Sequence, residues 1–142
     1  SVMTAHEIHI RELHKKDIPS IAAILEQSPE AARWNAADCL HYTSFVAEAD
    51  GKVAGFLSAR SIAGESEILN LAVDVAFRRR GVARRLIGHF FLFSADICFL
   101  EVREGNQAAI QLYESMGFVK ISKRSNYYSN PSEAAIVLRR SA

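Results

Sequence analysis

The chain has 142 residues, a length typical of one domain, and we predict a single domain over residues 1–142. Hydrophobic residues make up 49% and charged residues 23% of it, which argues against a disordered or fibrous protein. The net charge of +1 argues against a dedicated nucleic-acid-binding protein. That charge is unevenly distributed. Residues 1–71 carry six basic and ten acidic side chains, whereas residues 72–142 carry eleven and six, so an anionic partner is expected at the second half.

The cysteines and the apolar runs of the sequence indicate the cellular compartment in which the protein is expected. Cys39 and Cys98 lie far apart in apolar surroundings, which predicts two buried thiols in a reducing compartment. The first ten residues lack a charged start followed by an apolar stretch, so no signal peptide is expected. The longest apolar run, Leu86–Leu100, contains polar residues and is shorter than the roughly 20 residues that span a bilayer. We therefore expect a cytoplasmic protein without a membrane segment.

The first half of the chain alternates short strands and helices. Apolar spacing predicts a strand, two helices and a pair of strands, over residues 7–13, 17–27, 35–42 and, for the strand pair, 43–62. Asp17 and Asn35 stand at the N-caps of the two helices, and Pro19 fits the first turn of the longer one. Asp50 and Gly51 join the two strands, a pair typical of hairpin turns in which both positions need positive φ.

The second half continues with strands and helices. The expected elements are a strand at 66–74, a loop entering a helix at 77–93, a strand at 97–104, a helix at 106–117, and strands at 118–125 and 134–140. The strand at 97–104 is largely apolar, which places it centrally in the sheet. Asn106 is positioned to cap the last helix, and Gly117 to end it. This order predicts an α/β fold with a mixed sheet of about seven strands and about four helices.

The densest chemical signal is the arginine-rich segment 78–85, which follows a strand and begins a helix. A helix N-terminus presents unpaired N–H groups and partial positive charge. Gly81 and Ala83 let a ligand approach the backbone, and the arginines add bidentate donors. These are properties of a pyrophosphate-binding loop, although neither a P-loop nor a Rossmann fingerprint is present. The alternatives are a basic surface helix or a nucleic-acid patch.

Residues 69–87 resemble the acetyl-CoA motif of the GNAT superfamily of N-acetyltransferases. The family pattern, Gln/Arg-x-x-Gly-x-Gly/Ala, is met by Arg78, Gly81 and Ala83. The segment 100–118 is most similar to the RimI-type N-terminal acetyltransferases, which acetylate the N-terminal alanine of a small-subunit ribosomal protein. The resemblance implies a GNAT fold, with a mixed, mostly antiparallel sheet splayed at the acetyl-CoA site. No metal is expected, since the five histidines show no ligand spacing.

The resemblance also implies how acetyl-CoA is held. Backbone N–H groups of the strand before the loop would polarise the thioester carbonyl, an oxyanion-type arrangement. Asn106 would bond the pantetheine arm, cap its own helix, or do both. The implied cofactor-binding residues are Leu71, Ala72, Val73, Arg78, Arg79, Arg80, Gly81, Val82, Ala83, Arg84, Asn106 and Tyr113.

Two residues match the catalytic positions of the family. Glu101, at the end of the apolar strand, matches the base that acts through water. The alternative is a structural carboxylate paired with Arg103 or with a helix-end amide. Tyr113 matches the acid that protonates the departing CoA thiolate, and its alternative is a half-buried packing tyrosine. The implied reaction is direct attack of an amine on the thioester.

Four residues are candidates for binding the acceptor: Trp34, Asn70, Tyr127 and Tyr128. The two tyrosines lie where RimI-type enzymes wall the peptide entrance, or are ordinary aromatics at a strand end. Asn70 faces away from Leu71 by strand alternation, and Trp34 lines the acceptor groove or fills the core.

Three classes of function remain open. The tyrosine wall favours a protein or peptide N-terminus, such as that of a ribosomal protein, while a closed cleft would favour a small amine. A binding module without catalysis is the third class, and the predicted acid and base argue against it. No nucleic acid or membrane partner is expected, and the chain is expected to be a monomer or a homodimer.

One helix departs from the family pattern. The spacing from the helix that follows Gly81 to the next strand is about four residues, or one helical turn, shorter than usual, and residues 90–93 are four consecutive apolar side chains. Four such residues cannot all face one core stripe. We therefore expect both helix faces to be covered, a dimer contact, or an exposed apolar patch.

Overall fold

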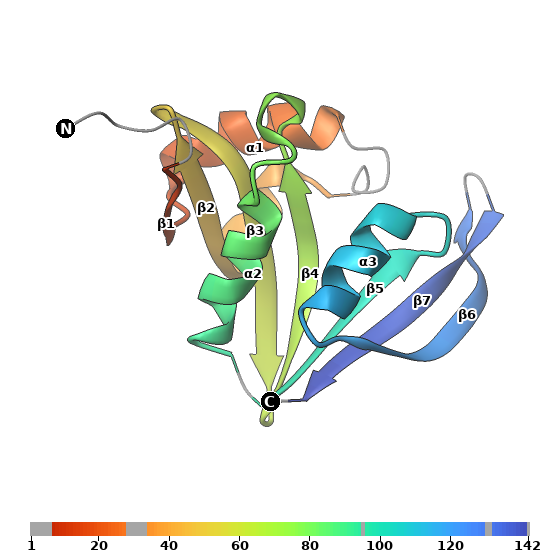
Figure 1. Ribbon diagram of the computed structural model, residues 1–142. Helices are drawn as coiled ribbons and strands as arrows, with labels where there is room; N and C mark the ends of the chain where they lie inside the picture. The colour runs from red at the N-terminus through yellow and green to blue at the C-terminus, as the bar shows by residue number, and fades with distance from the viewer. Residues whose placement is uncertain (1–6, 28–33, 95, 130–131, 142) are drawn as a thin grey trace. The chain divides into compact units, whose positions relative to one another are not determined.

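The computed structural model describes residues 7–27, 34–94, 96–129 and 132–141 (Figure 1). The strands are β1 (His9–Glu12), β2 (Thr43–Ala49), β3 (Lys52–Ile62), β4 (Glu65–Val73), β5 (Ile97–Arg103), β6 (Val119–Ser129) and β7 (Ser132–Ser141). The helices are α1 (Ile18–Glu26), α2 (Val82–Phe91) and α3 (Gln107–Ser115), with short 3-10 helices η1 (Lys15–Asp17), η3 (Ala36–His41) and η4 (Val75–Phe77).

The strands form a sheet in the order β1-β2-β3-β4-β5-β7-β6. β4 pairs with β5 in parallel, while β1–β2, β2–β3, β5–β7 and β6–β7 are antiparallel. The predicted α/β class with a mixed, mostly antiparallel sheet is therefore confirmed, and so is the interior place of β5. Among the described residues, no helix is long and apolar enough to cross a membrane.

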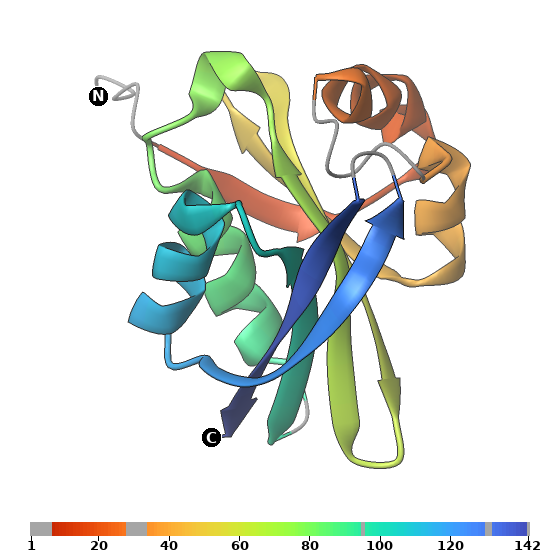
Figure 2. The ribbon, with the colours of Figure 1, turned by 90° about the vertical axis from the view of Figure 1, so that its right-hand side faces the viewer.

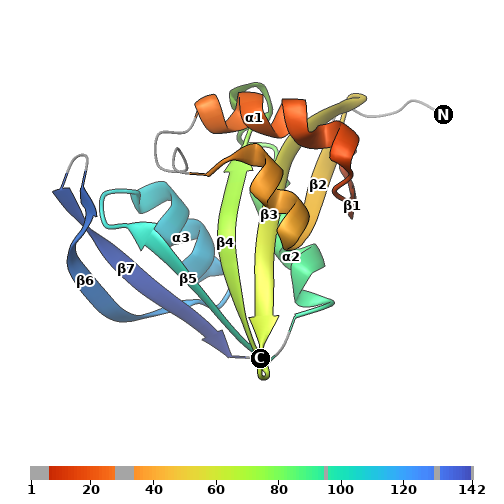
Figure 3. The ribbon, with the colours of Figure 1, turned by 180° about the vertical axis from the view of Figure 1, so that it is seen from behind.

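The chain divides into two compact units, and the first comprises Ser1–Arg60 and Asn70–Phe93. In it, α2 lies on one face of β2 and β3 (Figure 1), and α1 and η3 cover the opposite face (Figure 3). α2 turns its apolar stripe inward, because Val82, Leu86 and Phe90 recur at helical spacing and all three are buried. Asp50 and Gly51 take φ of 54° and 74°, so the predicted hairpin turn is confirmed.

The second unit comprises Ser61–Leu69 and Ser94–Ala142. β6 and β7 run side by side as a long antiparallel pair (Figure 2), and α3 lies over one face of β5 and its neighbours (Figures 1 and 3). α3 begins after Asn106, whose side chain accepts from the Ala109 N–H at 3.3 Å. It is followed by Gly117 at φ 98°. Both predicted ends of this helix are confirmed.

One of the two expectations about the first helices needs correction. Asp17 stands at the N-cap of α1, but its carboxylate bonds no N–H of that helix. It accepts instead from the His14 N–H and from both terminal nitrogens of Arg11, each at 2.8 Å. The Arg11 guanidinium also holds the pKa of Asp17 below its usual value. Residues 36–41 form a short 3-10 helix that Asn35 caps, so the short helix predicted at 35–42 is confirmed.

The exposure of the two cysteines and of the residues at the end of α2 can be compared with the sequence predictions. Cys39 and Cys98 are free and each is 1% exposed, and burial raises the pKa of both thiols. Phe90 is 1% exposed, whereas Leu92 and Phe93 are 76% and 64% exposed. The apolar run after Gly81 is thus partly core and partly an exposed patch, one of the three outcomes expected for it.

Candidate active site

The loop before α2 is shaped by its backbone. Gly81, the N-cap residue, takes φ of 78°, and Arg79 takes 65°, which is unusual for a residue with a side chain. A Cβ atom at Gly81 would meet nothing within 4 Å, so the space in front of it is open. The first N–H groups of α2 receive no side-chain cap from Gly81. A ten-residue helix therefore presents an accessible, partly positive N-terminus, which fits a phosphate group.

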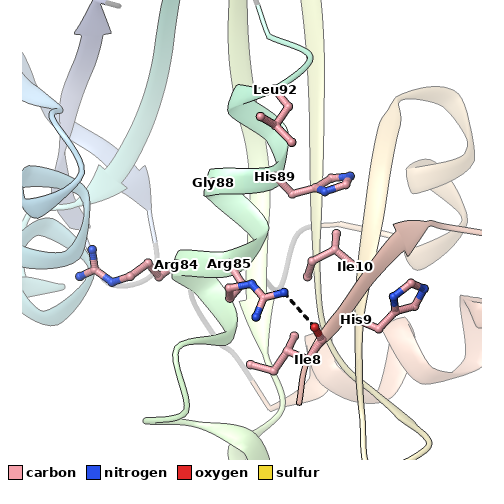
Figure 4. A pocket seen from close by; sticks show the side chains of 8 residues that line it. All are labelled: Ile8, His9, Ile10, Arg84, Arg85, Gly88, His89 and Leu92. Carbon is pink, nitrogen blue, oxygen red and sulfur yellow. Dashed lines mark hydrogen bonds between the residues drawn. The ribbon is translucent and has the colours of Figure 1, made fainter. Parts of the chain in front are cut away.

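The arginines around this loop have different surroundings. Arg80 pairs with Asp50 at 3.0 Å, and its guanidinium lies 5.1 Å from the centre of the Phe77 ring. Arg85 donates to the Ile8 carbonyl at 2.9 Å, and Arg84 leaves α2 on the side away from that contact (Figure 4). Arg80 thus ties the loop to the hairpin turn, and Arg85 ties α2 to the residue before β1. The positive charges of Arg80 and Arg85 remain near the loop, but these contacts fix the orientation of both side chains.

The strand that leads into the loop is held close to its neighbours by a glycine. A Cβ atom at Gly55 of β3 would lie 2.8 Å from the Ala72 carbonyl oxygen and 3.1 Å from a methyl of Val82. Only glycine therefore allows β3 to approach both β4 and the first residue of α2. Sequence reasoning missed Gly55. An isolated glycine inside a strand pattern was the available signal.

The side chains of β4 alternate between a buried face and a more exposed face, as predicted. The parallel ladder of β4 with β5 runs over Glu65–Ile68, and the strand itself continues to Val73. Ala72 is buried, while Leu71 and Val73 are half-buried. Asn70 shares the buried face, opposite Leu71, and is 8% exposed. Its Nδ2 atom has no hydrogen-bond partner among the described residues, which leaves a buried donor unsatisfied.

Trp34 is half-buried and packs against the core cluster beneath α1 and η3, together with Ile18 and Val53. Its ring lies 5.5 Å from that of Tyr42. This is the core-packing alternative foreseen for Trp34, and a part in acceptor binding stays a prediction.

The two carboxylate oxygens of Glu101, in β5, have different surroundings. Its Oε1 atom lies 3.4 Å from Arg124 of β6, and its Oε2 atom is buried with no hydrogen-bond partner among the described residues. The partner considered from sequence, Arg103, instead pairs with Glu133 at 3.3 Å. A buried acceptor oxygen without a donor can receive a proton or an N–H or O–H group from a bound molecule.

Tyr113 lies on the buried face of α3 and is 8% exposed. Burial raises its pKa to about 12, and the charge of Tyr128 adds to the increase. Burial also raises the pKa of Tyr128, with a further contribution from the charge of Glu101. In the second unit, therefore, the charge of Tyr128 acts on Tyr113, and the charge of Glu101 acts on Tyr128. The Tyr113 hydroxyl stays protonated throughout the neutral range.

The two adjacent tyrosines differ in exposure and in contacts. Tyr127 is 50% exposed, with the Arg124 guanidinium 5.2 Å from its ring centre. Tyr128 is half-buried, and the Arg103 guanidinium lies 4.1 Å from its ring centre. The two rings stand nearly perpendicular, at 83° and 5.2 Å. Sequence reasoning did not foresee Arg103 and Glu133 as neighbours of Tyr128, because Arg103 and Glu133 are 30 residues apart.

No group of three or more His, Cys, Asp or Glu side chains in the described part of the chain could hold a metal ion. Residues 8–118 match the model of the acetyltransferase (GNAT) family. The chain belongs to this family. It is therefore an acetyltransferase of the class that uses acetyl-CoA.

Individual GNAT proteins resemble the chain over nearly its whole length. The ribosomal protein bS18-alanine N-acetyltransferase of Escherichia coli strain K12 is 34% identical over 140 residues, which cover 91% of this chain and 94% of the relative. The crystal structure of the S18-alanine N-acetyltransferase from Escherichia coli matches with a TM-score of 0.84 and 32% identity, over 95% and 94% of the two chains. Ard1 from Thermoplasma volcanium matches with a TM-score of 0.85 and 32% identity, over 95% and 97%.

Proposed function

We propose that this GNAT enzyme acetylates the N-terminal α-amine of a protein or peptide. The observation that carries the proposal is the 34% identity, over nine-tenths of both chains, with a ribosomal protein bS18-alanine N-acetyltransferase. The wall formed by Tyr127 and Tyr128 supports an extended peptide as the acceptor. A bS18-like N-terminus starting with alanine is the first substrate to test.

Acetyl-CoA would be held by the loop and by the strand before it. The accessible N-terminus of α2, with Gly81 in front of it, fits the pyrophosphate, and Arg78, Arg79 and Arg84 add positive charge nearby. The backbone of Leu71–Val73 would bond the thioester carbonyl, and Asn106 the pantetheine arm. When bound, acetyl-CoA supplies the electrophilic carbonyl carbon of the acetyl group.

Glu101 is the proposed base. An α-ammonium group with a pKa of about 7.7–8.0 must lose one proton before its nitrogen can attack. The buried Oε2 atom, which has no partner among the described residues, is the oxygen that would accept this proton through a water molecule. Arg124, at 3.4 Å from Oε1, would orient the carboxylate.

Tyr113 is the proposed acid. Its pKa of about 12 ensures that its hydroxyl carries a proton at neutral pH. The same burial makes that proton harder to release, so donation is favourable only as negative charge develops on the departing sulfur. The proton would move from the phenol oxygen to the CoA sulfur as the carbon–nitrogen bond forms and the carbon–sulfur bond breaks. The second proton, which the nitrogen loses after its attack, would restore the phenol through solvent.

The acceptor would lie against Tyr127 and Tyr128. Asn70 of the first unit is a separate candidate, because its buried amide donor has no partner among the described residues and could bond a peptide carbonyl. Trp34 has the weaker case, because its ring is packed against the core cluster.

The test is a CoA-release assay with peptides of one sequence that begin with Ala, Ser, Met or Lys, and with polyamines and amino acids as small amines. We expect turnover of an Ala- or Ser-starting peptide. The matched control is the same peptide with its N-terminus already acetylated, which should give no CoA release. Turnover of a small amine without turnover of any peptide would overturn the proposal.

A further inference from the structure

Arg103 joins two structural elements near the acceptor wall. Its side chain is only 13% exposed, and its guanidinium carbon lies 4.1 Å from the centre of the Tyr128 ring. Its Nη1 atom lies 3.3 Å from Oε1 of Glu133, at the start of β7. Tyr128 and Glu133 are directly opposite each other in the β6–β7 register. Arg103 therefore contacts both members of one cross-strand pair.

Glu133 extends this contact to the turn between β5 and α3. Its second oxygen, Oε2, accepts from the Gly105 N–H at 2.6 Å. The same turn is bonded to β7 through the Glu104 N–H and the Ala134 carbonyl at 3.0 Å. A Cβ atom at Gly105 would lie 2.7 Å from Oε2, so a glycine is needed for the carboxylate to occupy this position. Asn106, the N-cap of α3, follows directly.

We infer that Arg103 and Glu133 form a positioning pair that fixes the Tyr128 ring against the β5–α3 turn and thereby sets the affinity for the acceptor. The inference deepens the proposed function, because it rests on Tyr128 belonging to the acceptor wall. Arg103 and Glu133 act through Tyr128 and the turn, so they are positioning residues and not catalytic ones. A guanidinium over an aromatic face, with a carboxylate beside it, restricts a tyrosine ring more than apolar packing alone.

A neighbouring ion pair provides the control. Lys123 of β6 and Glu104, the residue after β5, are 2.7 Å apart, with side chains 53% and 46% exposed. This pair joins the same two parts of the chain but is open to solvent, where an ion pair contributes little. A general loss of positive charge in this region would be reproduced by Lys123→Met, and a general loss of negative charge by Glu104→Gln. An effect specific to the positioning pair would not.

The first experiment measures steady-state kinetics with the best N-terminal peptide. Arg103→Met keeps the aliphatic stem and removes the cation, and we expect the acceptor KM to rise about 10-fold. The kcat and the KM for acetyl-CoA should stay within about 2-fold of the wild type. Arg103→Lys restores a cation to both partners and should return the acceptor KM to within about 3-fold. Lys123→Met, which also removes a cation, and Glu104→Gln should change none of these constants.

Coupling to Tyr128 separates positioning from general structural damage. In a Tyr128→Leu background, Arg103→Met should add less than about 2-fold to the acceptor KM, since the ring it positions is gone. An unchanged acceptor KM in Arg103→Met, or an equal effect with and without Tyr128, would overturn the inference.

Failure of the proposed function would be visible in the wild type, as no turnover of any peptide. The positioning pair is then tested by NMR, without acceptor. The ring signals of Tyr128, assigned with Tyr128→Phe, should shift in Arg103→Met, and the Gly105 amide signal should shift in Glu133→Gln. Neither should shift in Glu104→Gln. Tyr128 ring signals that match the wild type in Arg103→Met would overturn the inference independently of substrate.

Discussion

The loop at the start of α2 and the strands around Tyr113 carry the two halves of the proposed chemistry in different ways. At the loop, arginines are exposed, Gly81 and Arg79 take positive φ, and the helix N-terminus is accessible. In the second unit, Glu101 and Tyr113 are largely buried and electrostatically coupled through Tyr128. The first region would contact its ligand mainly through backbone N–H groups, whereas the second would act through individual side chains.

The difference predicts how each region responds to mutation. Backbone N–H groups persist when a side chain is replaced, so the loop should tolerate the loss of an arginine better than a change in backbone geometry. Buried polar groups interact strongly because little water surrounds them, so the cluster around Tyr113 should be sensitive to the loss of a single atom.

The largest effect is expected for Tyr113→Phe, which removes one hydroxyl from a buried ring. We expect kcat to fall by about 100-fold or more, while the dissociation constant for acetyl-CoA changes by less than about 2-fold. Single-turnover kinetics and calorimetric titration with CoA measure the two quantities. Wild-type turnover in this variant would remove Tyr113 from the acid role and weaken the contrast between the regions.

Glu101→Gln should lower turnover by about 100-fold at pH 7. The loss should shrink as pH rises above the α-amine pKa of about 7.7–8.0, because the acceptor then arrives already deprotonated. The measurement is kcat/KM for the peptide in wild type and variant from pH 6 to 9.5. A ratio that stays constant across this range would contradict the base assignment. The exposed Glu104→Gln should follow the wild-type profile.

Gly55→Ala tests whether the region around the loop depends on its backbone geometry. The added Cβ atom would press against the Ala72 carbonyl, and we expect the free energy of unfolding to fall by about 1–3 kcal/mol. Gly88→Ala in α2 is the matched control, since a Cβ atom there meets nothing within 4 Å. It should leave stability unchanged or raise it by up to about 1 kcal/mol. Urea unfolding of both variants decides whether close approach at Gly55 matters.

Titration of Tyr113 should appear in the stability at high pH. Its pKa of about 12 in the folded chain exceeds the ordinary value of about 10, so between these pH values the unfolded state binds fewer protons. The free energy of unfolding should therefore fall as pH rises from 10 to 12, and be unaffected by this group below pH 10. Tyr113→Phe should show a shallower decline. Equal slopes would contradict the burial argument.

The smallest effect is expected for Arg79→Ala at the loop. We expect the KM for acetyl-CoA to rise about 2- to 5-fold at low ionic strength, and less at high salt, because the side chain is exposed and its charge is screened. Kinetics at two salt concentrations provide the measurement. A loss above about 100-fold would mean that the loop, like the Tyr113 cluster, depends on individual side chains.

Local signals predicted most of the secondary structure. The Asp50-Gly51 turn and both ends of α3 depend on residues within a few positions of one another, so a single sequence contains enough information to place them. Asp17 departs from its expected cap because Arg11, which reaches it from β1, competes for the same carboxylate. Glu101 departs from its considered partner because β6 brings Arg124 to it, while Glu133 occupies Arg103.

The sequence by itself determined the family motif and the order of elements, because these are patterns of nearby residues, and the resemblance to the family implied the proposed acid and base. Only the tertiary structure decided which carboxylate pairs with which arginine, that Gly55 allows three elements to approach, and that Tyr113 is buried enough to have a pKa of about 12. The physical reason is the same in each case. Ion pairing, steric contact and desolvation depend on distances between residues far apart in the chain, and those distances are set when the strands pair.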